Sequence, residues 1–456
     1  MEIIQLIESQ RKFFNTDKTK SIEFRMDAIQ KLRNSLIFNE REILDALKSD
    51  LNKSDFEGYM SEIGMVRDEA GYVMKHLLKW ARNIKVSTPM AQFCSKSFIV
   101  PEPYGIILIM SPWNYPLQLC LEPLIGALAA GNCAIIKPSA YAPATSKIVA
   151  DMITRIYPPE YVSVVEGGRK ENSELLDQKF DYIFFTGSVA VGKQVMESAS
   201  RNLTPVSLEL GGKSPTIVDK TANIALAAKR IAFGKYLNAG QTCVAPDYIL
   251  AHSSIKDQLI TELGKQIKAF FGNDPLTDKD LPRIINEKHF DRILGLMKGE
   301  KTVIGGKSNR ESRLIEPTVL DGITFDSPVM QEEIFGPVLP VIPFNDINEV
   351  IALLKDKPKP LALYLFSDDK TIQNMVLRKL SFGGGCINDT IIHLATSKMG
   401  FGGVGNSGMG SYHGKFSFDT FTHYKSIVHK KNWIDIPMRY HPYSERNFSL
   451  IKMFLK

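Results

Sequence analysis

The sequence contains few cysteines, no long apolar run and no large excess of charge of either sign. Its five cysteines are an odd number spread through 456 residues, which is not the pattern of a disulfide framework and favours a reducing compartment. The net charge of +6, from 56 basic and 50 acidic residues, is small for this length, so nucleic-acid binding is not expected. No stretch is apolar for long enough to cross a bilayer, and the first residues lack the basic flank and apolar core of a signal peptide. We therefore expect a cytoplasmic protein without a membrane span.

The sequence does contain an ordinary share of hydrophobic residues, 44%, in a chain long enough for about two or three domains. Apolar runs at 104–110, 133–137, 162–165 and 181–185 alternate with helical patterns at 117–130 and 143–156. Runs that are apolar throughout are typical of strands covered on both faces. The alternation predicts an α/β fold with a doubly wound parallel sheet, in which ligands bind beyond the C-terminal ends of the strands. Asn114, Lys137 and Ser188 all follow such ends.

The segments around this alternation are less uniform. Residues 1–81 read as amphipathic helices. Residues 82–103 mix apolar residues with Ser, Thr and Lys, which suits an exposed hairpin or edge strand. Strands are predicted at 338–342 and 361–366 and a helix at 346–354, whereas the glycine-rich runs 383–385 and 400–410 are predicted to be loops.

A glycine-bearing turn follows the strand at 181–185 and opens a helix. It contains Gly187, Ser188 and Gly192, and free backbone N–H groups together with the helix dipole favour a pyrophosphate there. The spacing differs from the G-x-G-x-x-G of standard dinucleotide folds, so a plain helix start fits equally well. Lys137 either offers an ammonium group to a phosphate or to ribose hydroxyls, or is a solvated lysine at a strand end.

Glu209 lies inside the apolar run 206–210. A carboxylate is costly to bury unless it has a partner or a role. An apolar setting raises the pKa of such a group toward neutrality, which suits a general base. The alternative is an edge-strand glutamate that faces water.

A helical pattern from residue 224 leads to a cysteine on a loop. Thr221 is the predicted N-cap, and the helix is expected to end near Gly240, because glycine adopts the left-handed turn that stops a helix. Cys243 then lies just before a strand-like run at 248–250. A loop of this kind exposes a thiol at the floor of a cleft, as a nucleophile requires, although a lone cysteine is more often a small buried hydrophobe.

Six motifs follow one another in a fixed order. They are Asn114 in Pro-Trp-Asn-Tyr-Pro, Lys137 in Lys-Pro-Ser, Ser188 in Phe-Thr-Gly-Ser, Glu209 in Leu-Glu-Leu-Gly-Gly, Cys243 in Gly-Gln-Thr-Cys and Glu333 in Glu-Glu-Ile-Phe-Gly-Pro. Together they resemble the aldehyde dehydrogenase superfamily over nearly the whole chain. The compact length and the ending at 438–443 resemble its class 3 branch, which includes fatty-aldehyde and aromatic-aldehyde enzymes.

The resemblance implies a fold and its division into domains. A dinucleotide-binding domain is expected at 1–81 and 104–209, and an α/β catalytic domain at 210–399. Bridging or oligomerisation segments, partly β, are expected at 82–103 and 400–456. The resemblance also implies a homodimer.

The resemblance further implies the oxidation of an aldehyde to a carboxylic acid with NAD or NADP. Cys243, as thiolate, would attack the aldehyde carbon, and the oxyanion would be met by the Asn114 amide and the Cys243 N–H. Glu209 would activate the water that hydrolyses the resulting thioester. The residues implied to bind the cofactor are Lys137, Gly187, Ser188, Gly192, Leu210, Glu333 and Phe335. No metal is implied.

The substrate site is implied by family position alone. Tyr115, Phe233, Ile391, Leu394 and Phe401 are expected to line an apolar mouth, with Asn388 at a nearby strand end, although each is also a plausible core residue. Medium-chain aliphatic or aromatic aldehydes would suit such a mouth. The family usually has a glutamate after Lys-Pro-Ser, where this chain has Ala140. The missing carboxylate removes a charge that repels a 2′-phosphate, so we expect NADP to be accepted alongside NAD.

Other functions remain open at this stage. An acylating, CoA-dependent dehydrogenase would pass the acyl group to a thiol, which leaves little use for Glu209. A non-catalytic binding protein on the same fold is the second alternative. A cysteine–histidine hydrolase is disfavoured because no histidine is close to Cys243 in sequence, although His393 and His413 remain candidates in space.

The last residues, 425–456, are basic and end in a short amphipathic stretch at 448–456. We expect this tail to pack on a dimer. Peripheral contact with a membrane surface is the alternative.

Overall fold

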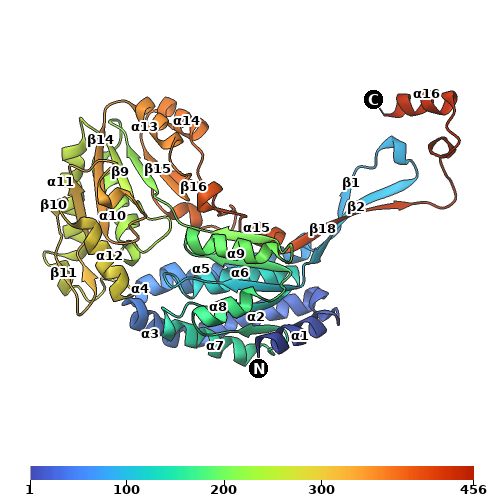
Figure 1. Ribbon diagram of the computed structural model, residues 1–456, viewed down its shortest axis with the longest axis horizontal. Coiled ribbons are helices and arrows are strands. Elements are labelled where there is room, and N and C mark those ends of the chain that lie inside the picture. The colour runs from blue at the N-terminus through green and yellow to red at the C-terminus, as the bar shows by residue number, and fades with distance from the viewer. Residues whose placement is uncertain (1, 456) are drawn as a thin grey trace.

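The computed structural model describes residues 2–455, and it contains two bodies and a projecting arm (Figure 1). One body holds the N-terminal helices and a six-stranded sheet, and the other holds a seven-stranded sheet. The arm is a three-stranded sheet made from two distant parts of the chain. The predicted α/β class with a parallel sheet is confirmed.

Residues 2–81 are mostly helical, as predicted. The helices are α1 Ile3–Phe14, α2 Ile22–Phe38, α3 Glu40–Leu51, α4 Asp55–Gly58 and α5 Gly64–Trp80. The α2 helix begins at Ser21, whose hydroxyl accepts a hydrogen bond from the Phe24 N–H and so satisfies one of the unpaired donors at the helix start. Of these helices, α2 and α5 pack on α6 Gln118–Ala130, a helix that connects two strands of the six-stranded sheet.

The six-stranded sheet has the order β17-β7-β6-β3-β4-β5, and all neighbours are parallel except β17 and β7. Its strands are β3 Ile106–Met110, β4 Cys133–Lys137, β5 Val162–Val164, β6 Tyr182–Thr186, β7 Val206–Glu209 and β17 Gly408–Met409. The connecting helices are α6 Gln118–Ala130, α7 Pro143–Ile156, α8 Arg169–Leu176 and α9 Val189–Ser200. These bounds match the predicted alternation of strand and helix.

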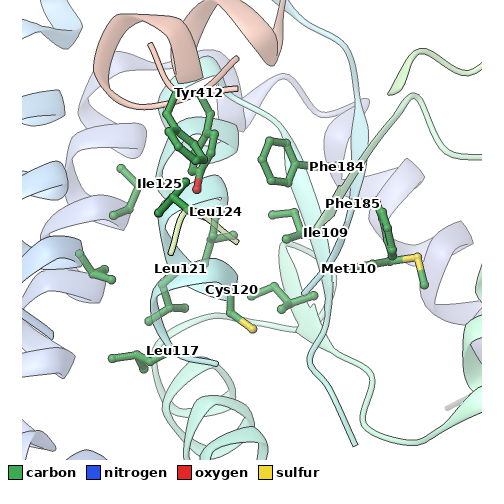
Figure 2. Packing of buried hydrophobic residues seen from close by; sticks show 14 of the residues in the cluster. Ile109, Met110, Leu117, Cys120, Leu121, Leu124, Ile125, Phe184, Phe185 and Tyr412 are labelled. Atoms are coloured by element: carbon green, nitrogen blue, oxygen red, sulfur yellow. The ribbon is translucent and has the colours of Figure 1, made fainter. Parts of the chain in front are cut away.

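The core of this body is packed between α6 and the central strands (Figure 2). All 13 residues of α6 are buried, which explains why its sequence is apolar on every side. Leu121 and Leu124 lie beside Ile109 and Phe184 in Figure 2. Burial of each such side chain stabilises the folded state by about 1.5–3 kcal/mol. Helix α6 is therefore firmly packed on the sheet.

The C-terminal ends of the parallel strands meet at one edge of the sheet. Met110 pairs with Lys137, and Thr186 pairs with Glu209. The register therefore brings two of the predicted site residues, Lys137 and Glu209, to the same edge although 72 positions separate them in the sequence.

The seven-stranded sheet has the order β10-β13-β14-β9-β8-β15-β16 and is parallel except for β10. Its strands are β8 Pro215–Val218, β9 Tyr248–His252, β10 Lys301–Ile304, β13 Thr318–Asp321, β14 Val338–Phe344, β15 Ala362–Phe366 and β16 Gly384–Ile387, and a separate pair joins β11 Ser308–Asn309 to β12 Leu314–Ile315. Its helices are α10 Ile224–Tyr236, α11 Lys256–Phe271, α12 Glu287–Met297, α13 Ile347–Lys355 and α14 Lys370–Lys379.

Two glycine-rich runs predicted to be loops contain strands. Gly384 and Gly385 belong to β16, which pairs with β15. A Cβ added at Gly385 would collide with the carbonyl oxygen of Leu363, so glycine is present here because the two backbones approach closely. The run 400–410 contains β17, whose Gly408 pairs with Glu209. The loop prediction was therefore wrong for Gly384 and Gly385 and for the two residues of β17.

The helix before Cys243 also differs from the prediction at its two ends. Its N-cap is Asn223, whose side chain accepts a hydrogen bond from the Leu226 N–H, whereas the Thr221 hydroxyl donates to Asp219. The helix ends at Tyr236, and a short turn, η4 Leu237–Gly240, follows it. Asn238 and Ala239, with φ of 52° and 51°, are already left-handed before Gly240.

The arm consists of β1 Ile84–Val86, β2 Ser95–Pro103 and β18 Thr422–Lys430, all antiparallel. The hairpin predicted at 82–103 is confirmed. The chain enters β18 from α15 Gly414–Thr420 and continues to α16 Glu445–Phe454, which lies at the far end of the arm, away from both bodies (Figure 1). Within residues 2–455, no helix has the length and apolar character that crossing a membrane requires.

Candidate active site

Cys243 lies between η4 and β9, half-buried, and lines a cavity of about 180 Å³. All five residues predicted to form an apolar mouth line the same cavity; they are Tyr115, Phe233, Ile391, Leu394 and Phe401. They come from the loop after β3, from α10 and from the segment after β16. The fold therefore brings together one thiol and a set of apolar side chains that are far apart in the sequence.

The thiol of Cys243 is held in its protonated form. Burial, followed by the negative charges of Glu333 and Glu209, raises the pKa of Cys243 to about 12. Its own N–H and that of Val244 act in the opposite direction. Because the thiolate is the reactive form, a nucleophilic Cys243 needs either a base or a nearby positive charge during the reaction.

Glu209 ends β7 and is only 3% exposed. Neither of its carboxylate oxygens has a hydrogen-bond partner within the described residues. Burial therefore raises the pKa of Glu209 well above its ordinary value. A buried carboxyl group without partners is uncommon and calls for a functional explanation. The alternative of a water-facing edge-strand glutamate is wrong, because β17 covers the outer edge of β7.

Asn114 and Tyr115 both reach the segment that carries Cys243. The Asn114 Nδ2 donates to the Gln241 carbonyl oxygen at 3.0 Å, and the Tyr115 hydroxyl lies 2.7 Å from the Thr242 Oγ1. A side-chain amide has two N–H groups. One of those of Asn114 is engaged by Gln241, which leaves the other to meet an oxyanion.

Glu333 and Phe335 follow η6 Pro328–Met330 and lie beside the loop after β7. A Cβ added at Gly211 would collide with the Glu333 carboxylate, so that carboxylate is packed directly on the glycine backbone. Burial and the charge of Asp247 raise the pKa of Glu333 to about 8. The Phe335 ring meets Trp113 edge-on, with ring centroids 5.3 Å apart.

A second cavity, of about 450 Å³, lies next to Glu333. It is lined by the start of α9 at Val189, by Gly211 and Gly212 and by Glu333. It therefore adjoins both the glycine turn of the first body and the carboxylate of the second body.

The predicted phosphate-binding turn begins α9. Ser188 is the N-cap and accepts a hydrogen bond from the Val191 N–H, and both Gly187 and Ser188 are accessible to solvent. Gly192 is buried against Leu210, whose Cδ2 would be 2.7 Å from an added Cβ. Gly192 and Leu210 are thus packed on one another. Their contact brings the start of α9 close to the end of β7 and so shapes the site for a ligand.

Lys137 is 3% exposed, so the alternative of a solvated lysine is wrong. Its Nζ donates to the carbonyl oxygens of Pro138 and Gly167, at 2.8 and 2.7 Å. Burial lowers the pKa of Lys137 below its ordinary value. An ammonium has three donors, so one remains for a ligand at this edge.

The structure places Asn388 outside the cavity that contains Cys243. Its amide is bonded to the backbone of Ser367, accepting from the N–H at 2.9 Å and donating to the carbonyl oxygen at 3.2 Å. The left-handed backbone of Asn388, with φ of 58°, favours this local arrangement. The expectation that Asn388 lies in the substrate pocket is therefore corrected.

His413 approaches the site but is not arranged as a base for Cys243. It lines the same cavity, and its Nε2 lies 3.5 Å from the Glu122 carboxylate. His393 Nδ1 faces the Cys386 sulfur instead, at 3.7 Å. Burial lowers the pKa of both histidines to about 4, so neither is a strong base at neutral pH, and the hydrolase alternative loses support.

Several residues near the site were missed by the sequence analysis, above all Lys53 and Glu62. Both are buried, and both act on residues 55 or more positions away. One signal was available for Glu62. It continues the apolar stripe of α5, which contains Val66, Val73 and Leu77 at helical spacing, and a carboxylate on a buried face marks a partner or a role.

The residues present fit a dinucleotide. Gly211 lets the Glu333 carboxylate pack directly on its backbone at the wall of the second cavity, the start of α9 faces the same cavity, and Lys137 adds a buried ammonium group at the C-terminal edge of the six-stranded sheet. Carboxylates bind ribose hydroxyls, and helix starts bind phosphates.

Comparison with known proteins agrees with this arrangement. Residues 1–427 match the aldehyde dehydrogenase family. The chain is 50% identical to a 4,4'-diaponeurosporen-aldehyde dehydrogenase of Staphylococcus aureus, over 100% of both chains. It is 43% identical, over 94% of both chains, to a dog (Canis lupus familiaris) enzyme named aldehyde dehydrogenase, dimeric NADP-preferring. A solved structure of the substrate-bound state of Staphylococcus aureus AldH superposes with a TM-score of 0.98 at 49% identity and covers 100% of both chains.

Proposed function

The chain belongs to the aldehyde dehydrogenase family and is an NAD(P)-dependent oxidoreductase that acts on aldehydes, and from this premise we propose which of its residues perform the reaction. The observation that supports the assignment most strongly is the shared neighbourhood of Cys243, the unpartnered Glu209 and the apolar cavity. Cys243 is the nucleophile, Asn114 the oxyanion donor and Glu209 the general base.

The Cys243 thiol first releases its proton to water. The thiolate sulfur then forms a bond with the aldehyde carbon, and the carbonyl oxygen becomes an oxyanion. The free N–H of the Asn114 amide and the Cys243 backbone N–H stabilise this charge, an effect worth roughly 10²–10³ in rate per donor. Loss of a hydride from the carbon leaves an acyl thioester on Cys243. The apolar lining of the cavity keeps bulk water away from this intermediate.

Glu209 takes a proton from the water that attacks the thioester. The carboxylic acid is then released and the Cys243 thiol is restored. Because burial raises the pKa of Glu209, its carboxylate is a stronger base toward this water than an ordinary carboxylate. No side chain of the described residues competes for its oxygens.

The cofactor, when bound, supplies the hydride acceptor. Lys137 and the turn at Gly187 and Ser188 would hold its adenosine and phosphate groups. Glu333 would bind the hydroxyls of the nicotinamide ribose, and Phe335 would lie beside the ring. Gly192 and Leu210 shape this site by their packing. NADP would be accepted alongside NAD, because Ala140 offers no carboxylate against a 2′-phosphate.

The substrate is an aldehyde with an apolar body, of the medium-chain aliphatic or aromatic class. The residues around Cys243 favour such a body, since Phe233, Ile391 and Phe401 line the cavity. The Staphylococcus aureus relative is named for a diaponeurosporen aldehyde, so longer apolar chains belong in the same test panel.

We also propose a homodimer in the cytoplasm, with the domain boundaries given by the sequence. The arm projects from the two bodies, and α16 packs against neither of them (Figure 1). The dog relative is named dimeric. All five cysteines are free, which fits a reducing compartment.

The test is a cofactor-reduction assay over a panel of aldehydes, with product analysis in the presence and absence of CoA. Wild-type protein should reduce the cofactor, form the free carboxylic acid and be indifferent to CoA. Cys243→Ala should abolish the reaction, whereas Cys386→Ala, at another half-buried cysteine, should retain it. An acyl-CoA product, or full activity in Cys243→Ala, would contradict the proposal.

A further inference from the structure

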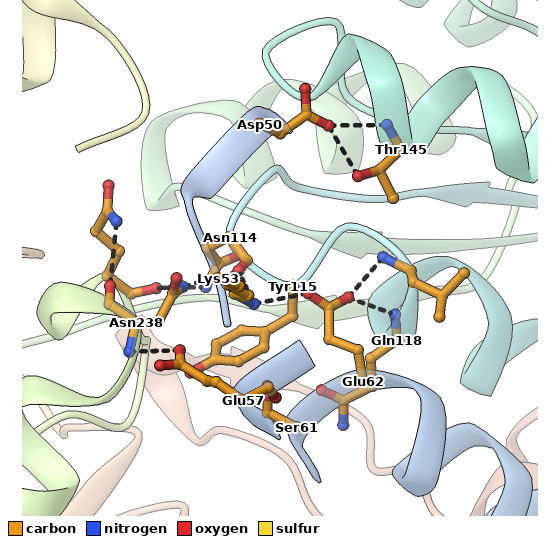
Figure 3. A network of polar contacts seen from close by, with 12 residues as sticks. Asp50, Lys53, Glu57, Ser61, Glu62, Asn114, Tyr115, Gln118, Thr145 and Asn238 are labelled. Carbon is orange, nitrogen blue, oxygen red and sulfur yellow. Dashed lines mark hydrogen bonds and ion pairs between the residues drawn. The ribbon is translucent and has the colours of Figure 1, made fainter. Parts of the chain in front are cut away.

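A buried ion pair lies behind the loop that carries Asn114 (Figure 3). The Lys53 Nζ donates to the Glu62 Oε1 at 2.6 Å, and both side chains have 0% exposure. Burying two charges in this way costs free energy that their mutual attraction does not always return. The pair is therefore weak evidence for stability, and its other contacts indicate what it does.

Glu62 fixes the start of α6. Its second oxygen, Oε2, accepts hydrogen bonds from the Leu117 and Gln118 N–H groups, at 2.8 and 3.2 Å. The first N–H groups of a helix have no partners within the helix, and a carboxylate there also interacts favourably with the helix dipole. Glu62 thus determines where the loop after β3 ends.

Lys53 fixes the middle of the same loop. Its Nζ also donates to the Asn114 carbonyl oxygen, at 3.0 Å. The Asn238 Nδ2 donates to the same oxygen at 2.8 Å, so the carbonyl has a donor from each body of the molecule. With its peptide held from two sides, the Asn114 side chain projects toward Gln241, to which it is bonded.

Lys53 supports the neighbouring residue as well. Its Nζ lies 4.0 Å from the centre of the Tyr115 ring, within the range of a cation–π interaction. The Tyr115 hydroxyl in turn contacts Thr242, immediately before Cys243. One buried ammonium therefore supports two consecutive residues, Asn114 and Tyr115, each of which reaches the segment that carries Cys243.

We propose that Lys53 and Glu62 are positioning residues that hold the Asn114 amide where the oxyanion forms. This inference rests on the proposed role of Asn114 as an oxyanion donor. Neither Lys53 nor Glu62 lines the cavity, so they act through Asn114 and not on the substrate. Because a donor displaced by about 1 Å loses much of its effect, removing the pair should slow the step in which charge develops.

The experiment is a double-mutant cycle on the 456-residue chain. Lys53→Met alone would leave the Glu62 charge buried and unpaired, and the variant would be at risk of not folding. The test variant is therefore Lys53→Met with Glu62→Gln, in which the amide oxygen at position 62 still accepts from the start of α6. It is compared in the wild-type and Asn114→Ala backgrounds by the rate of the first turnover of cofactor reduction and by KM for the cofactor.

A matched control is Asp50→Asn. Asp50 is buried and accepts from the Ala144 and Thr145 N–H groups at the start of α7, at 3.1 and 2.8 Å (Figure 3). It therefore does for α7 what Glu62 does for α6, but without contact to Asn114. It should lower thermal stability and leave the first-turnover rate unchanged.

In the wild-type background, the paired substitution should slow the first turnover roughly 10- to 100-fold, with KM for the cofactor unchanged. In the Asn114→Ala background, the same substitution should have an effect below about threefold, because its route of action is already gone. An equal factor in both backgrounds, or no change in the wild type, would overturn the inference. If Asn114→Ala by itself leaves the rate unchanged, it is the proposed role of Asn114 that fails.

Discussion

Glu209 and Cys243 illustrate how single side chains acquire unusual chemistry from their surroundings. Burial raises the pKa of both groups. In the proposed reaction each must lose its proton, because only a thiolate attacks the aldehyde and only a carboxylate accepts a proton from water. Their shared environment therefore links the two half-reactions to pH in the same direction.

The rate of turnover should rise with pH, and part of the rise should depend on Glu209. The folded enzyme keeps Glu209 protonated to a higher pH than a free glutamate, so hydrolysis gains as pH increases through the pKa of that group. Glu209→Gln should lower kcat roughly 10²–10⁴-fold and remove this part of the profile. The measurement is kcat against pH for both proteins, and a variant that keeps the wild-type profile and rate would contradict the role.

The choice between NAD and NADP should depend on residue 140. Ala140→Glu places a negative charge near the site proposed for the adenosine ribose, and repulsion of about 1–2 kcal/mol lowers kcat/KM for NADP roughly tenfold. Ala140→Gln, of similar size but neutral, is the matched control and should change little. Steady-state rates with both cofactors decide the matter, and equal effects of the two substitutions would argue against a charge mechanism.

The residues that sequence reasoning found are those whose chemistry is local. Cys243, Glu209 and Glu333 lie in short motifs, and Glu209 also stands out as a carboxylate in an apolar strand. Lys53 could not be found in this way, because its importance comes from the Asn114 carbonyl 61 positions away. Asn388 shows the opposite error, in which a family position suggested a pocket residue and a local bond to Ser367 occupies its amide.

At the scale of elements, the short helix α4 is hydrogen-bonded to the loop before Cys243. The Glu57 Oε1 accepts a hydrogen bond from the Asn238 N–H at 2.8 Å, and Asn238 begins the left-handed part of η4. A Cβ added at Gly240, with φ of 73°, would collide with the carbonyl oxygen of Gly336. The loop is therefore held from both sides, and glycine is required where it packs on the backbone of Gly336.

Glu57 should make stability depend on pH. Burial raises its pKa to about 7, so the folded state binds a proton that the unfolded chain releases between about pH 4.5 and 7. The sign follows directly: this contribution is fully present at low pH and is lost as pH rises through 7. Relative to Glu57→Gln, the wild-type free energy of unfolding should fall by roughly 2–3 kcal/mol across that window. Chemical denaturation of both proteins across this pH range measures the free energy of unfolding. If the difference between the two proteins does not change with pH, the expectation is contradicted.

The elements were predicted best where their residues are buried on all sides. Strands β3, β4 and β6 and helix α6 show continuous apolar runs because both faces are covered. Strands β16 and β17 were not predicted, because their glycines are present where two backbones approach closely. In the sequence alone, such glycines look the same as the glycines of a loop. The N-cap was misplaced by two residues, from Asn223 to Thr221, since both residue types are good caps and tertiary contacts decide between them.

At the scale of the whole molecule, the arm and its terminal helix are the least covered part. Trp433, Tyr443 and Leu455 are 73%, 67% and 69% exposed, which is unusual for large apolar side chains in a tail that touches neither body. A second copy of the chain would supply the missing cover. Composition predicted the hairpin and the amphipathic end of the chain, but no local pattern in the sequence indicated that α16 lies at the far end of the arm, away from both bodies.

A chain shortened after residue 431 should therefore associate more weakly. Sedimentation velocity should show the full chain as a dimer at micromolar concentration and the shortened chain shifted toward monomer. Anionic vesicles should not retain either protein. A monomeric full chain would contradict the dimer, and vesicle binding that depends on residues 432–456 would favour the membrane alternative.

The central claim is that Cys243 holds the acyl group between oxidation and hydrolysis. The most direct test is the mass of the Glu209→Gln protein, quenched after mixing with an aldehyde and the oxidised cofactor. Because hydrolysis is blocked, the mass should increase by one acyl group in place of one hydrogen, and digestion should locate it on the peptide that contains Cys243. Cofactor reduction with no adduct, or an adduct on any other residue, would contradict the account.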